Sequence, residues 1–165
     1  MRTAMTLTLR TATILTLALA CLAAAEAQVP FKGTLQGQET DLSQGNPPTQ
    51  ILVDGDVAGV ATQLGRFTMT YKVTVSLPAG TSTGSAELTA ANGDIIFTTI
   101  IGLGVPTDTP GLNRIVEINP ITGGTGRFAG AQGSFVVDRL VELATQPATT
   151  FGSIQGTITK DPRRH

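Results

Sequence analysis

The sequence predicts an all-β fold, an eight-stranded antiparallel up-and-down barrel, and three observations carry this prediction. The chain holds eight short segments rich in Val, Ile and Thr, separated by turn residues. One of them, residues 66–77, alternates apolar and polar side chains without interruption. The dipeptide Asn92-Gly93 lies between two such segments and is typical of a tight hairpin. Beyond residue 27, apolar residues do not recur at the spacing of a helix.

The expected strands cover residues 31–38, 50–62, 66–77, 85–90, 94–101, 113–119, 134–143 and 150–159. The strict alternation of residues 66–77 indicates a strand that is covered on one face only. Gly55 and Gly59 interrupt the second segment and indicate bulges or tight bends. Gly80 and Gly84 are expected in the turn after the third segment.

Eight consecutive strands with short connections favour a closed barrel, because closure leaves no sheet edge exposed. A β-sandwich is the alternative with the same number of strands. Residues 41–49 form an expected loop that could lie as a flap over one end. An eight-stranded barrel is either filled by side chains or just wide enough for one small ligand. Small residues would leave room if they point inward, as at Gly33, Gly37, Gly152 and Gly156.

The start of the chain has the pattern of a cleavable signal peptide. Two arginines precede an apolar stretch at residues 11–22, and Ala25 and Ala27 supply the small residues of a cleavage site. The apolar stretch is too short to span a membrane. We therefore expect a signal peptide over residues 1–27 and a single β-barrel domain over residues 28–165, exported to the periplasm or the medium.

Cys21 offers an alternative end to the signal, because the preceding Leu-Ala-Leu-Ala is close to a lipoprotein box. Ala18 stands where a larger aliphatic residue is usual, so removal of Cys21 with the signal is the preferred interpretation. The remaining chain then has no cysteine, and its one histidine is the last residue, His165. We expect no thiol nucleophile, no ordered histidine base, no metal site and no cofactor.

Charge and motifs exclude further classes. The formal net charge is −1 without a basic stripe, which argues against nucleic-acid binding. No later segment is apolar for long enough to span a membrane as a helix. The segment Gly124-Thr125-Gly126, with Gly130, resembles a phosphate-binding turn, but such a turn needs a following helix. Residues 134–143 are expected to be a strand, so a nucleotide site is disfavoured.

Three residues are the candidates for ligand binding. Tyr71 lies on the apolar face of its strand, and its hydroxyl needs a partner if it is buried. Glu117 and Arg139 either belong to an outward polar face, which alternation favours, or point into the lumen. In the lumen they could pair or polarise a ligand. Asp54 and Asp56 lack the other ligands of a calcium loop and are expected to be solvated turn residues.

Two motifs resemble a known group of barrels. Residues 121–133, ITGGTGRFAGAQG, are similar to a glycine-rich segment of dirigent proteins and of secreted bacterial proteins in the allene oxide cyclase barrel-like superfamily. Residues 61–68, ATQLGRFT, resemble a second landmark of the bacterial proteins, with Gln63 where a histidine is expected. The resemblance implies an eight-stranded barrel and, as in plant members, a homo-oligomer, specifically a trimer.

The glycine-rich motif also has a structural interpretation. Gly124, Gly126 and Gly130 are expected to give the compact connection the positive φ angles that it needs. Arg127 and Phe128 would act as a latch, with the Phe128 ring plugging one end of the barrel.

Three functions remain open at this level. Dirigent proteins and allene oxide cyclases steer reactive intermediates in a shaped pocket, so the resemblance implies a cyclase or isomerase as one alternative. Because the expected domain has no cysteine and no internal histidine, binding of a small apolar molecule without catalysis is preferred. A structural, envelope-associated domain with a filled barrel is the third alternative. The resemblance transfers a fold and not a reaction.

Overall fold

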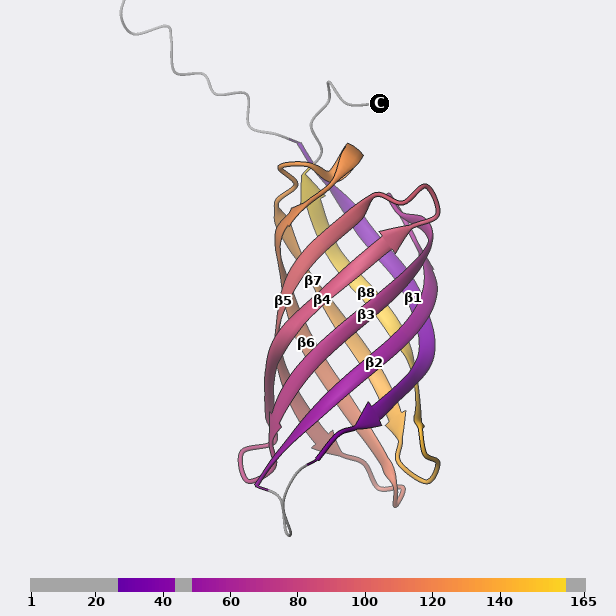
Figure 1. Ribbon diagram of the computed structural model, residues 1–165, viewed down its shortest axis with the longest axis vertical. Helices are drawn as coiled ribbons and strands as arrows, with labels where there is room; N and C mark the ends of the chain where they lie inside the picture. Colours follow the sequence, from indigo (N-terminus) through magenta and orange to yellow (C-terminus); the bar gives the residue numbers. More distant parts are fainter. Residues whose placement is uncertain (1–26, 44–48, 160–165) are drawn as a thin grey trace, which may run out of the picture.

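The strands form a closed barrel, in which the first strand pairs with the last (Figure 1). The structure, a computed structural model, describes residues 27–43 and 49–159. Each strand pairs antiparallel with the next, and β1 pairs with β8, which confirms the predicted barrel and excludes the sandwich. The strands are β1 (Gln28–Asp41), β2 (Gln50–Ala61), β3 (Gly65–Ser76), β4 (Thr81–Ala90), β5 (Ile95–Pro106), β6 (Leu112–Gly124), β7 (Gly133–Glu142) and β8 (Ala148–Thr159).

Several strands are longer than the sequence predicts. β6 continues to Gly124, and β4 begins at Thr81. Because Gly84 lies within β4, the prediction of Gly84 in a turn is wrong. Gly84 pairs with Val73, and a Cβ atom on it would collide with the backbone of β3. The glycine therefore belongs to the strand and lets the two strands approach each other.

The glycines of β2 also have a different role from the predicted bulges. The pairings of β2 with β1 and β3 run without a register shift. Instead, the ring of Tyr71 occupies the space beside Gly55, and the ring of Phe67 lies beside Gly59. A side chain at either glycine would displace an aromatic ring from the interior.

Inward side chains fill much of the barrel. The largest fully buried ones include Phe31, Phe128, Phe135, Met69, Leu88 and Ile96. The ring centroids of Phe31 and Phe135 are 5.0 Å apart, a separation at which aromatic pairs are favourable. Gly156 pairs with both residues and lies in the strand between them.

The glycines of β1 and β8 leave less open space in the lumen than their size suggests. Gly33, Gly37, Gly152 and Gly156 lie in register with inward-facing residues, as one of the two sequence interpretations requires. However, a Cβ atom on any of them would meet the backbone of a neighbouring strand. The missing side chains therefore permit close approach of strands, and the open volume lies elsewhere.

Some predictions concern residues that the structure does not describe. The signal peptide with Cys21, the terminal His165 and residues 44–48 of the expected flap lie outside residues 27–43 and 49–159. Export and the cleavage site therefore stay predictions. Within the described ranges, no helix has the length and apolar character needed to span a membrane.

Candidate functional site

The two ends of the barrel are built differently. The turn η1 (Gly126–Phe128) lies at one end of the barrel (Figure 1). The Phe128 side chain in this turn is almost fully buried and belongs to the hydrophobic core. The opposite end, between the β3–β4, β5–β6 and β7–β8 connections, contains a pocket of about 320 Å³. Its apolar wall includes Ile51, Val53, Val73, Val75 and Ile115. Its charged lining residues are Glu39, Glu117 and Arg139.

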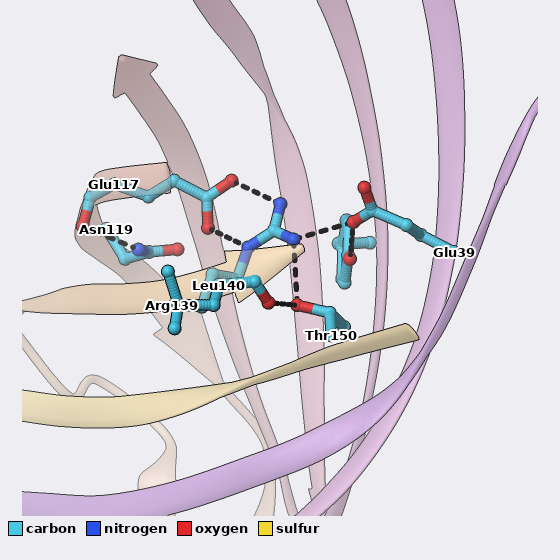
Figure 2. A network of polar contacts seen from close by, with 7 residues as sticks. Glu39, Glu117, Asn119, Arg139, Leu140 and Thr150 are labelled. Carbon is cyan, nitrogen blue, oxygen red and sulfur yellow. Dashed lines mark hydrogen bonds and ion pairs between the residues drawn. The ribbon is translucent and has the colours of Figure 1, made fainter. Parts of the chain in front are cut away.

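Arg139 is the centre of a buried polar cluster on the floor of this pocket (Figure 2). Its Nε and Nη2 atoms donate to the two carboxylate oxygens of Glu117, each at 3.1 Å. Its Nη1 atom donates to Oε2 of Glu39 at 2.6 Å and to the Thr150 hydroxyl at 3.1 Å. One guanidinium therefore binds two carboxylates from strands at distant positions in the sequence.

The strand pattern explains why these side chains point inward. Arg139 lies between the buried Val137 and Val141 on the inward face of β7. In β8, Gly152 pairs with Arg139, and a Cβ atom there would lie 2.6 Å from Cβ of Arg139. The absence of that atom leaves space for the stem of the arginine. The Glu117 backbone carbonyl accepts a 3.3 Å hydrogen bond from the Asn119 side chain.

Tyr71 joins the cluster from β3. Its hydroxyl donates to Oε2 of Glu39 at 2.6 Å, the same oxygen that Arg139 binds. The Cζ atom of Arg139 lies 5.1 Å from the centre of the Tyr71 ring, within the range of a cation–π contact. The hydroxyl thus has the partner that burial requires.

Burial and neighbouring charges fix the protonation of two members. Burial raises the pKa of the Tyr71 phenol well above its ordinary value; the Arg139 charge offsets part of this rise, and Glu39 and Glu117 add to it. Burial by itself would lower the pKa of Arg139, but Glu117, Tyr71 and Glu39 together raise it above its ordinary value. Tyr71 is therefore a neutral hydrogen-bond donor and Arg139 a permanent cation.

The structure brings all three sequence candidates, Tyr71, Glu117 and Arg139, into one cluster. The outward alternative for Glu117 and Arg139, which alternation favoured, is wrong, because both side chains are buried inside the barrel. The outward neighbour Asp138 pairs instead with Arg114, at 2.5 Å. The role of the three candidates, Tyr71, Glu117 and Arg139, in ligand binding stays a prediction.

Glu39 was not predicted as a site residue. It lies beyond the segment expected for the first strand, because β1 continues to Asp41. The signal in the sequence is spacing: Glu39 follows the buried Phe31 and Leu35 at intervals of four residues, on the same face. A longer first strand would have placed its carboxylate inside the barrel.

The expected position of Asp54 and Asp56 in a turn is also wrong. Both residues lie within β2, where they pair with Lys72 and Thr70 of β3. The Asp54 carboxylate forms an exposed ion pair with Lys72 at 2.5 Å. These acids belong to the outer polar face of the sheet, because their register alternates with the buried Val53 and Val57.

The glycine-rich segment builds the opposite end. Gly126 and Gly130 have φ angles of 53° and 77°, which a glycine adopts without strain. Gly124 does not have a positive φ, but a Cβ atom on it would lie 2.7 Å from atoms of Phe128. The Arg127 side chain donates to the Leu64 carbonyl at 3.2 Å.

Comparison with known proteins gives a structural neighbour of the barrel. No protein-family model matches the chain, and no curated protein matches it. Among solved structures, a pterocarpan synthase dirigent protein superposes with a TM-score of 0.58 at 12% sequence identity. The superposition covers 82% of this chain and 90% of the dirigent protein. At this identity the similarity concerns the fold alone, and the chain therefore has a dirigent-like, closed eight-stranded barrel fold.

Proposed function

We propose that the protein binds one small, largely apolar molecule in the pocket at the open end of the barrel. The observation that carries this proposal is the 320 Å³ pocket with aliphatic walls and a polar floor. Its volume is at the lower limit of the roughly 300–1,000 Å³ that is usual for small-molecule sites. A few polar groups in a mostly apolar pocket suit the orientation of such a ligand.

The contrast within the lumen supports binding over a purely structural role. Large side chains such as Phe31, Phe135 and Met69 fill the interior towards the closed end. At the open end, by contrast, the buried cluster of Glu39, Glu117 and Arg139 lines a pocket. Replacing a buried ion cluster by apolar residues is often neutral or stabilising, so stability alone gives little reason to keep one.

A steering protein that directs the conversion of its ligand is the second candidate. The fold of a pterocarpan synthase dirigent protein favours it, because that protein is named for a synthase. The Glu39 carboxylate lines the pocket and accepts a hydrogen bond from the neutral Tyr71 hydroxyl, so it is held in position to orient a polar group of a bound molecule. Mass spectrometry of the bound molecule before and after incubation separates the candidates, since a binder returns it unchanged.

Binding of an apolar fluorescent probe, 1-N-phenylnaphthylamine, tests the pocket. The chain has no tryptophan, so protein emission contributes little background in the wild type. We expect saturable binding that Ile51→Trp abolishes, because residue 51 is half-buried and lines the pocket. Leu52→Trp is the matched control, since the next residue of β2 is exposed. Equal binding by both variants would contradict the proposal.

We propose a second copy of this chain as the partner for the outer surface. Exposed apolar side chains lie across β5, β6 and β7 beside the exposed Arg114–Asp138 ion pair, namely Ile101, Leu103, Val105, Ile118 and Val136. Large contiguous patches of exposed apolar side chains often mark interaction sites. Light scattering after size exclusion should give an oligomer for the wild type and a monomer for Ile118→Lys. A monomeric wild type would refute this assignment.

We also propose export with cleavage before Gln28, from the signal pattern of residues 1–27. The intact mass of the exported protein decides it. A mass that starts at a lipidated Cys21 would establish a lipoprotein instead.

A further inference from the structure

The charges on the pocket floor do not balance. Glu39 and Glu117 carry two formal negative charges, and Arg139 carries one positive charge. Among the described residues that line the pocket, no other side chain is charged. Residues 44–48 contain no ionisable side chain either. The site therefore has one formal negative charge in excess, in surroundings where an uncompensated charge is costly.

The guanidinium of Arg139 already forms hydrogen bonds with other side chains of the protein. Its guanidinium donates to both oxygens of Glu117, to Glu39 and to Thr150, and it lies over the ring of Tyr71. A ligand carboxylate or phosphate would have to break these bonds and would then lie beside two acidic side chains. The geometry disfavours anionic ligands, although an arginine lines the pocket.

One carboxylate oxygen of Glu39 remains available to accept a hydrogen bond from a ligand. Its Oε2 atom accepts from both Arg139 and Tyr71, whereas Oε1 forms no hydrogen bond with the described residues. Figure 2 shows this second oxygen turned away from Arg139. The Glu39 side chain lines the pocket and is 11% exposed, which makes it the most accessible of the three charged groups.

We propose that the ligand is an apolar molecule with one protonated amine, and that the ammonium group pairs with Oε1 of Glu39. This inference rests on the proposed function of the pocket. The ammonium supplies the missing positive charge, and the aliphatic wall of Val53, Val73 and Ile115 takes the apolar body. A hydrogen bond between charged groups in a site shielded from water discriminates strongly among head groups.

Calorimetric titration with three probes of identical tail tests the proposal. The probes are n-octylamine, n-octanol and n-octanoate at neutral pH. We expect the amine to bind at least about tenfold more tightly than the alcohol, a ratio worth about 1.4 kcal/mol, and octanoate to bind most weakly. Glu39→Gln should remove the preference for the amine. Glu142→Gln should preserve it, because Glu142 is an exposed residue of β7 at the same end of the barrel.

The outcomes separate the two proposals. If no probe binds, or if Ile51→Trp leaves their binding unchanged, the pocket itself is not a binding site. If octanol or octanoate binds the wild type as tightly as octylamine, the pocket stands and the amine inference is wrong. The comparison of the three probes on the wild type decides this even if Glu39→Gln does not fold.

Discussion

The closed and open ends of the barrel are lined by side chains of different chemistry. At the closed end the Phe128 ring is buried, and the charged group that contacts it, Arg127, is 37% exposed. At the open end the charged group Arg139 is only 4% exposed, and a pocket adjoins it. An apolar plug stabilises without needing exact partners, whereas a buried ion cluster is stable only if complete. This difference agrees with the proposal that the closed end contributes stability and that the open end binds a ligand.

The largest expected effect removes the centre of the cluster. Arg139→Leu leaves the Glu117 and Glu39 carboxylates without their cation, which should lower the free energy of unfolding by about 3–5 kcal/mol. Urea denaturation measures the change. The control is Arg114→Leu, which removes an exposed pair with Asp138 and should have a much smaller effect. Similar losses for both variants would show that burial of the cluster is unimportant.

Removal of the plug is expected to be nearly as costly. Phe128→Ala deletes an almost fully buried ring and should lower the free energy of unfolding by about 3–4 kcal/mol. Phe151→Ala, on the outer face of β8, should change it by only about 0.5 kcal/mol. Probe binding at the open end should persist in folded Phe128→Ala. Loss of binding there would mean that the two ends do not act independently.

The turn before Phe128 should be moderately sensitive. Gly126 and Gly130 both have positive φ, so Val at either position should cost about 1–3 kcal/mol. A Cβ atom on Gly126 would also collide with the Asp94 carboxylate, whereas Gly130 has open space. Thermal melting should therefore rank Gly126→Val as the less stable variant. An unchanged melting temperature in Gly126→Val would show that this glycine is incidental.

The smallest effect concerns alkaline pH and the open end. The folded state raises the pKa of Tyr71, so above about pH 10 the unfolded chain loses a proton that the folded chain keeps. Stability should then fall with rising pH, by about 1.4 kcal/mol per unit from this group. Tyr71→Phe should flatten this dependence. Because the chain has a single tyrosine, tyrosinate absorbance should rise together with unfolding and not before it.

The sequence predicts the barrel better than it predicts the site. Alternation over residues 66–77 and the turn at Asn92-Gly93 report local geometry, and both are features of the structure. The cluster depends on register between strands, which no local pattern contains. Glu117 and Arg139 are 22 positions apart, and Glu39 is 100 positions from Arg139. Only closure of the barrel brings these three residues together.

The glycines show the same limit. A glycine inside a strand is compatible with a bulge, a bend or a close approach, and the choice depends on the partner strand. Gly55 is explained by Tyr71 on β3, and Gly152 by Arg139 on β7. Both glycines therefore make space for members of the cluster, a relation visible only after the strands are paired.

The pairing of β1 with β8 has a consequence for how the barrel forms. Gln28 pairs with Thr159, so the first strand finds one of its two neighbours only at the far end of the described chain. Contacts this distant in sequence are slow to form, because a long loop must close before any pairing is gained. Until β8 is in place, β1 has an unpaired edge. We therefore expect Glu39 of β1 and Arg139 of β7, which form an ion pair in the closed barrel, to come together late in folding.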